Sequence, residues 1–133
     1  MKRRHLDIVR FGVVACAIAL AWAWLHSLGS SLCANTVLSE LPSPSCLLRA
    51  ALLESNCGAT TGFSRHVQIL RASETPQDDS AFVMDDNHGA ASLDVQLRWD
   101  DDARVVVSHD AQARVFRAEP SARGVSMGYE ARR

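Results

Sequence analysis

The chain has 133 residues, which suits one domain, and its overall net charge is −1 with 22% charged residues. The first 32 residues carry a net charge of +3, whereas the remainder has ten arginines against fourteen acidic residues, a net charge of −4. Binding of nucleic acid depends on neutralising phosphates, so a mildly acidic domain without a basic stripe excludes nucleic acid as an expected partner.

The first element expected along the chain is an export segment. A basic cluster at residues 2–4 precedes the uncharged, mostly apolar run Phe11–Leu25, and the stretch without a formal charge continues to Leu32. The shorter run suits the apolar core of a signal peptide, and the longer one is long enough, as a helix, to span about 30 Å of hydrocarbon. We therefore predict that residues 1–32 are a cleaved signal peptide or an uncleaved anchor in the membrane through residues 11–32, with the amino terminus inside.

Four cysteines bear on the covalent chemistry of the chain. Cys16 lies inside the apolar segment, whereas Cys33, Cys46 and Cys57 follow it. Disulfides persist in an oxidising compartment, and three exported cysteines leave one thiol over. The residues alone leave open which two are joined, and three free thiols are the alternative. No two cysteines are two to four residues apart and no histidine pair has ligand spacing, so no metal site is expected. No cofactor is expected either.

The helical period disappears after residue 32, and short apolar stretches separated by turn residues follow. Leu47–Leu53 is apolar on both faces, which predicts a central strand, and Leu93–Trp99 shows the clearest alternation. Ser73–Ser80 is predicted to be a solvated loop, and Asp100–Asp102 a turn. Eight strands are expected, at Thr36–Leu41, Leu47–Leu53, Arg65–Arg71, Ala81–Met84, Leu93–Trp99, Val105–Val107, Arg114–Ala118 and Gly124–Tyr129. The predicted fold is mainly β: an N-terminal helix, then a small antiparallel β-meander that forms a sandwich or an open barrel over residues 33–133.

Three short motifs occur in order after the apolar segment. They are Cys33-Ala34-Asn35, Ser43-Pro44-Ser45-Cys46 and Cys57-Gly58-Ala59-Thr60-Thr61-Gly62-Phe63-Ser64. This order resembles a family of small uncharacterised bacterial exported proteins, whose pattern runs Cys-x-Asn, a Ser-Pro-Asp-Gly turn and Cys-Gly-Ala-Thr-Thr-x-Phe-Ser. The resemblance covers most of the chain after residue 32, and only the Cys-Gly-Ala-Thr-Thr stretch is specific.

The resemblance implies a disulfide and a location but no reaction. Because Ser45-Cys46 replaces the Asp-Gly of the turn, Cys33 and Cys57 are the shared cysteines, and the resemblance implies that they form the disulfide. Cys46 is then a free thiol, and we expect it to be buried in the core. The implied location is the bacterial inner membrane with the C-terminal domain in the periplasm, or the periplasm itself if the signal is cleaved.

The residues that carry chemistry do not form a recognisable active site in the sequence. Ser64 and His66 are expected on one face of a strand and Ser108 and His109 on opposite faces, and no Gly-x-Ser-x-Gly elbow is present. No catalytic residue is therefore assigned. The acidic stretch Asp85–Gly89 does not fit the glycine and glutamate positions of an EF-hand loop.

The small-residue loop after Cys57 has two interpretations. Gly58, Ala59, Thr60, Thr61, Gly62 and Phe63 lack the lysine and the helix of a phosphate-binding loop, so a tight structural connection is favoured. A recognition loop is the alternative, because binding residues are often found on loops held by a rigid sheet.

The sequence as a whole predicts a membrane-tethered, non-enzymatic β domain that binds an envelope partner or serves the envelope structurally. The Gly58–Phe63 loop or the acidic turns would be its contact surface. The alternative is a small envelope enzyme or a redox-responsive protein that uses Cys46 or the face of His66.

Overall fold

The computed structural model describes residues 12, 14–24, 33–58, 61–77 and 79–133, and the chain divides into two units, Met1–Cys33 and Ala34–Arg133. In the first unit, residues 14–24 are helical, and their side chains are exposed. Part of the predicted export segment Phe11–Leu32, namely residues 11, 13 and 25–32, lies outside the described residues. Among the residues that are described, no helix combines the length and the apolar character needed to cross a membrane.

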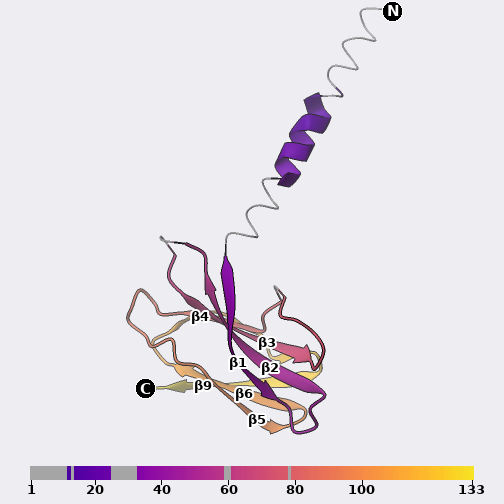
Figure 1. Ribbon diagram of the computed structural model, residues 1–133. Helices are drawn as coiled ribbons and strands as arrows, with labels where there is room; N and C mark the ends of the chain where they lie inside the picture. The colour runs from indigo at the N-terminus through magenta and orange to yellow at the C-terminus, as the bar shows by residue number, and fades with distance from the viewer. Residues whose placement is uncertain (1–11, 13, 25–32, 59–60, 78) are drawn as a thin grey trace, which may run out of the picture. The chain divides into compact units, whose positions relative to one another are not determined.

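The second unit is mainly β and contains two sheets (Figure 1). Its strands are β1 (Ala34–Pro42), β2 (Leu48–Asn56), β3 (Ser64–Arg71), β4 (Phe82–Asp85), β5 (Gln96–Asp101), β6 (Arg104–Asp110), β7 (Arg114–Ala118), β8 (Ser121–Ala122) and β9 (Val125–Arg132). The first sheet has the order β1-β2-β3-β4-β7 and the second the order β5-β6-β9-β8. Figure 1 shows the orange and yellow strands of the second sheet beside the purple strands of the first.

One hydrophobic core joins the two sheets as a sandwich. Alternate residues of β2, β3 and β4 and of β6 and β9 belong to the same buried cluster: Ala50, Leu52, Val67, Ile69, Phe82, Met84, Val105, Val107, Val125 and Met127. Because side chains alternate across a strand, these positions mark the facing surfaces of the two sheets. The sandwich form of the predicted fold therefore agrees with the core.

Strand β2 confirms a central strand where Leu47–Leu53 was predicted, except that Leu47 lies outside the strand and is exposed. It pairs with β1 on one side and with β3 on the other. Its second apolar face, Ala51 and Leu53, is buried in a smaller cluster with Leu70. The predicted solvated loop Ser73–Ser80 is mostly exposed. It is attached to this outer face, where the Gln77 N–H donates to Gln68 Oε1 over 3.0 Å and Gln68 is buried.

The order of the strands is not a simple meander. Strands β1 to β4 follow one another antiparallel, but β7 returns to the first sheet beside β4, and β6 and β9 pair in parallel. Parallel neighbours need a long crossover connection, which the chain carrying β7 and β8 supplies. The predicted turn at Asp100–Asp102 is also displaced, since Asp100 and Asp101 belong to β5. The sequence did not predict the order of the strands, because the alternation of apolar residues shows which residues face a core but not which strands are neighbours.

The only tyrosine of the chain reports directly on this core. Tyr129 on β9 stacks on Phe82, with ring centroids 5.4 Å apart, and its hydroxyl donates to the Glu119 carbonyl over 2.6 Å. Burial, with a smaller contribution from the charge of the Glu119 carboxylate, raises the pKa of Tyr129 from 10.0 to about 12.

A titration of the phenolate absorbance of Tyr129 should therefore have its midpoint near pH 12 in the folded protein and about two pH units lower in denaturant. Because the folded state holds the neutral phenol, this contribution to stability is complete below pH 10 and is lost as the pH rises through 12. Equal midpoints in the two states would contradict the burial of this hydroxyl.

Candidate functional site

The disulfide predicted from the family resemblance is confirmed. Cys33 and Cys57 are bonded to each other, whereas Cys16 and Cys46 are free. Cys33 directly precedes β1 and Cys57 directly follows β2, and the neighbouring residues Ala34 and Asn56 are partners in the ladder. The bond therefore closes the end of the β1–β2 hairpin next to the Gly58–Phe63 loop.

The Gly58–Phe63 loop begins as a closed turn, although Ala59 and Thr60 lie outside the described residues. Gly58 has a φ of 114°, and its carbonyl accepts hydrogen bonds from the Thr61 N–H over 3.2 Å and from Thr61 Oγ1 over 3.3 Å. These hydrogen bonds of Thr61 agree with the interpretation of the loop as a tight structural connection. Phe63 at the end of the loop is 46% exposed, so a large apolar side chain is available there for contact.

Ser64 and His66 lie on the same face of β3, as predicted. Ser64 Oγ is 3.0 Å from His66 Nε2, and Ser80 Oγ is 3.1 Å from His66 Nδ1. Burial, together with the positive charge of Arg117, lowers the pKa of His66. A neutral imidazole between two hydroxyls resembles part of a hydrolase triad, but the group that would orient the base is a serine here and not a carboxylate.

The other sequence candidate for a general base is elsewhere. His109 is on β6 and its ring centroid is 5.3 Å from that of Phe82, inside the sandwich. The neighbouring Ser108 is on the opposite face, where its hydroxyl donates to Glu130 over 3.2 Å. Since His66 faces outward from the first sheet and His109 faces the core, the structure does not bring the two histidines together.

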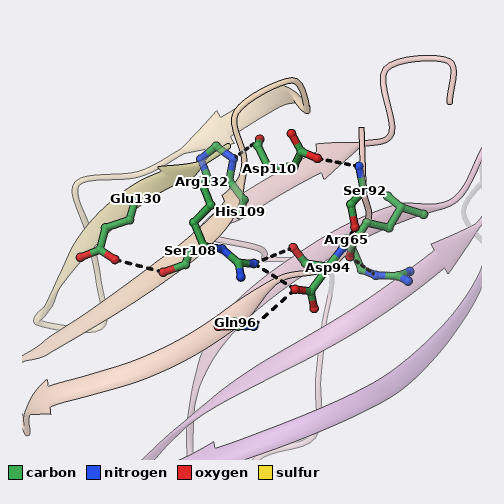
Figure 2. Close-up of polar contacts among 10 residues, drawn as sticks. Arg65, Ser92, Asp94, Gln96, Ser108, His109, Asp110, Glu130 and Arg132 are labelled. Atoms are coloured by element: carbon green, nitrogen blue, oxygen red, sulfur yellow. Dashed lines mark hydrogen bonds and ion pairs between the residues drawn. The ribbon is translucent and has the colours of Figure 1, made fainter. Parts of the chain in front are cut away.

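A pocket that the sequence did not indicate lies beside the end of β9 (Figure 2). It has a volume of about 160 Å³ and is lined by Ser92, Asp94, Asp110, Arg132 and Arg133. Figure 2 shows Arg132 directed at Asp94, with their closest charged atoms 3.1 Å apart, and the Ser92 N–H directed at Asp110 over 2.9 Å. These residues are far apart in sequence, so only the register of the sheet assembles them.

The polar groups of this pocket mainly satisfy one another. Asp110 accepts backbone N–H groups from Gln112 over 2.8 Å and from Ser92, and these two hydrogen bonds hold the pKa of its carboxyl below the usual value. The Asp94 carboxylate is paired with Arg132. The cluster therefore fastens the segment before β5 to the ends of β6 and β9, and its carboxylates are committed to that role.

The acidic stretch at residues 85–89 forms an internal ion pair. Asp85 binds the Arg114 guanidinium of β7 and accepts the Asn87 N–H over 2.9 Å. The hydrogen bond from Arg114 is the main reason that the pKa of Asp85 is lowered. In the part of the chain that the structure describes, no group of three or more potential ligands is placed to hold a metal ion.

Cys46 was expected to be buried, and this expectation is wrong. Cys46 is an exposed, free cysteine in the turn between β1 and β2, beside a pocket of about 290 Å³ that Glu40 and Arg49 also line. The turn is held by the Cys46 N–H, which donates to the Ser43 carbonyl over 2.8 Å. The φ of Cys46 is 60°, in the left-handed region where a side chain with a Cβ is strained.

Glycine adopts the conformation that Cys46 has here without a Cβ clash. We expect Cys46→Gly to raise the free energy of unfolding by about 1 kcal/mol, because glycine adopts the left-handed region without a Cβ clash. The matched control is Cys46→Ser, which removes the thiol, keeps the Cβ and should change stability by less than about 0.5 kcal/mol. Denaturant unfolding measures both, and a glycine variant no more stable than the serine variant would contradict the strain.

A further cavity of about 320 Å³ lies beside the β7–β8 connection. It is lined by apolar Ile69 and Ala81 and by charged Arg117, Glu119 and Arg123, among others. Arg117 already donates to the Ser80 carbonyl over 3.1 Å, and Arg123 is paired with a glutamate, so both cations are partly satisfied.

Exposed apolar side chains also lie on β1, the edge strand of the first sheet. All nine of its residues are exposed, and Val37, Leu38 and Leu41 are 43%, 45% and 36% exposed. The alternation of this segment predicted a strand, but only the order of the sheet shows that it is at an edge. A comparison with known protein families, curated proteins and solved structures finds no match to this chain.

Proposed function

We propose that this protein is an exported, membrane-tethered β domain that binds a partner in the bacterial envelope without catalysing a reaction. In this proposal residues 11–32 act as the anchor or signal, and residues 33–133 work in the periplasm. The Cys33–Cys57 disulfide supports this location, because such bonds persist in oxidising compartments. The family resemblance of the Cys57–Ser64 stretch points the same way.

The contact surface that we propose is the free edge of β1. A sheet edge presents unpaired N–H and C=O groups, and proteins usually protect it with charges, bulges or short strands. β1 has nine residues and a single charge, Glu40. Its carbonyl at Leu41 is already bound by the Trp99 indole over 3.0 Å, whereas no hydrogen bond among the described residues occupies the outer edge of residues 34–40.

The other edges of the two sheets are better protected. β7 has five residues, carries Arg114 and Arg117, and is irregular where it pairs with β4. The Arg114 guanidinium also lies over the Phe116 ring, 4.9 Å from its centroid. In the second sheet β8 has only two residues, and β5 carries Arg98 with two aspartates. The pairing of β1 with β2 also contains a register shift, between Val37 and Ser39. However, Glu40 is the single charged residue of β1.

This contrast is the observation that carries the proposal. An extended segment of a partner can add to such an edge through main-chain hydrogen bonds, with side-chain contacts to Val37 and Leu38. Phe63, directly before β3, is a second exposed apolar side chain, in the Gly58–Phe63 loop.

The test is co-purification of the full chain from native membranes with an affinity tag after Arg133. We expect Val37→Lys to reduce the recovered partner at least about tenfold, because a lysine on an edge strand opposes strand addition. The matched control is Val115→Lys, at an exposed position of the protected edge β7, which should leave recovery unchanged. Equal recovery from the two variants would refute the β1 surface.

Exposed Cys46 favours a second function, in which the protein responds to redox conditions through this thiol. Labelling of Cys46 by a thiol reagent in intact cells, faster than labelling of a free cysteine in unfolded protein, would support it. A rate no higher than that of the unfolded reference would leave Cys46 as an unreactive surface residue.

A further inference from the structure

We infer that the strand added at β1 comes from a second copy of this chain, antiparallel to the first and related to it by a two-fold axis at Val37. The two five-stranded sheets would then form one continuous sheet. This inference rests on the proposed role of β1 as the contact surface.

The number of open edges favours a closed dimer. Each molecule offers one long edge with little charge, whereas β5, β7 and β8 are short or charged. An association that uses the same edge on both molecules consumes both edges and stops at two copies, as a two-fold interface does. An open edge that could pair with any strand promotes aggregation, and pairing with a second copy removes that risk without another protein.

The charge of β1 is compatible with self-pairing in one register above others. The open stretch is residues 34–40, since the Leu41 carbonyl is bound by Trp99, and Val37 is its midpoint. With Val37 opposite Val37 of the second copy, Glu40 lies opposite the uncharged Ala34 of the second copy. A register centred on Glu40 would place the two carboxylates together, which is unfavourable for directly opposed residues.

In the same register, which includes the shift that β1 shows towards β2 between Val37 and Ser39, the other opposed side chains are uncharged. Thr36 lies opposite Leu38 of the second copy, and Asn35 lies opposite Ser39 of the second copy. Opposed Cβ atoms in an antiparallel pair are about 4.5–5.5 Å apart, so cysteines introduced at opposed positions are close to disulfide range. The register therefore predicts which cross-links form.

The experiment uses the full chain in native membranes, in a Cys16→Ser/Cys46→Ser background that removes both free, exposed thiols. Val37→Cys is treated with a mild thiol oxidant, which takes the two electrons and two protons released as the S–S bond forms between two copies. We expect a disulfide-linked dimer whose bridge maps to residue 37 in both copies, and a mixture of Thr36→Cys and Leu38→Cys copies should cross-link likewise. Phe116→Cys, exposed on β7, is the matched control and should yield at least about tenfold less dimer.

The outcomes separate this inference from the proposed function. If Val37→Cys yields no more dimer than Phe116→Cys while Val37→Lys still loses an envelope protein, the second copy is wrong and the β1 surface stands. If Val37→Lys changes neither self-association nor partner recovery, both fail. A dimer that forms through Val37→Cys, and self-association of tagged and untagged copies that Val37→Lys abolishes, would support the inference.

Discussion

Replacing Phe82 with alanine should lower the free energy of unfolding by about 3–5 kcal/mol, the largest effect that we expect from a single substitution. Phe82 on β4 is fully buried, and its ring lies 5.4 Å from that of Tyr129 on β9 and 5.3 Å from that of His109 on β6. One side chain of the first sheet therefore contacts two strands of the second. Alanine would leave a cavity at the point where the sheets meet, because close-packed neighbours collapse only partly.

Denaturant unfolding followed by tryptophan fluorescence and circular dichroism would measure this loss. The matched control is Phe116→Ala, since Phe116 is an aromatic residue that is 59% exposed on β7. Loss of its contact with Arg114 should cost less than about 1 kcal/mol. A Phe82 variant as stable as the Phe116 variant would mean that the two sheets do not share this core.

Removing the disulfide should have the second largest effect. The bond between Cys33 and Cys57 closes a loop of about 25 residues, worth roughly 3 kcal/mol in the chain-entropy model. For a domain of this size, such a loss corresponds to a decrease in Tm of roughly 10–25 °C. The bond acts mainly on the unfolded chain, because it restricts the conformations that the reduced chain would otherwise gain.

The measurement is a thermal melt of the double variant Cys33→Ala/Cys57→Ala beside the parent protein, each with and without reductant. Reductant should lower the Tm of the parent towards that of the double variant and leave the double variant unchanged. Cys46→Ser is the control, and its response to reductant should equal that of the parent. A parent protein that reductant does not affect would contradict a stabilising role for the bond.

Sequence patterns predicted which segments form buried strands better than they predicted which strands lie next to each other in a sheet. The segment Leu47–Leu53, apolar on both faces, became the central strand β2, and Val105–Val107 lies in the buried strand β6. These predictions succeed because burial acts on each side chain through its own hydrophobicity. The disulfide was predicted from a shared motif, since spacing among three cysteines does not decide a pairing.

Among the candidate sites, contacts within one strand were predicted from the sequence, whereas contacts between distant segments were not. That Ser64 and His66 share a face follows from the two-residue period of a strand, and the structure agrees. The contact between Arg132 and Asp94 had no sequence signal, because it joins β9 to the segment before β5. Burial of Cys46 was predicted from the hydrophobicity of a thiol, but the turn holds this residue outside the core.

The sequence by itself determined the mainly β character of the chain after residue 32, the approximate places of eight strands and the contrast between a basic, apolar beginning and an acidic remainder. Only the tertiary structure decided that β6 and β9 pair in parallel, that β7 rejoins the first sheet and that β1 is left at an open edge. The physical reason is that strands pair through backbone groups that every residue carries, so the choice of neighbour depends on connections and on the whole core. The functional proposals rest on the order of the strands, because the edge of β1 exists only once the sheets have formed.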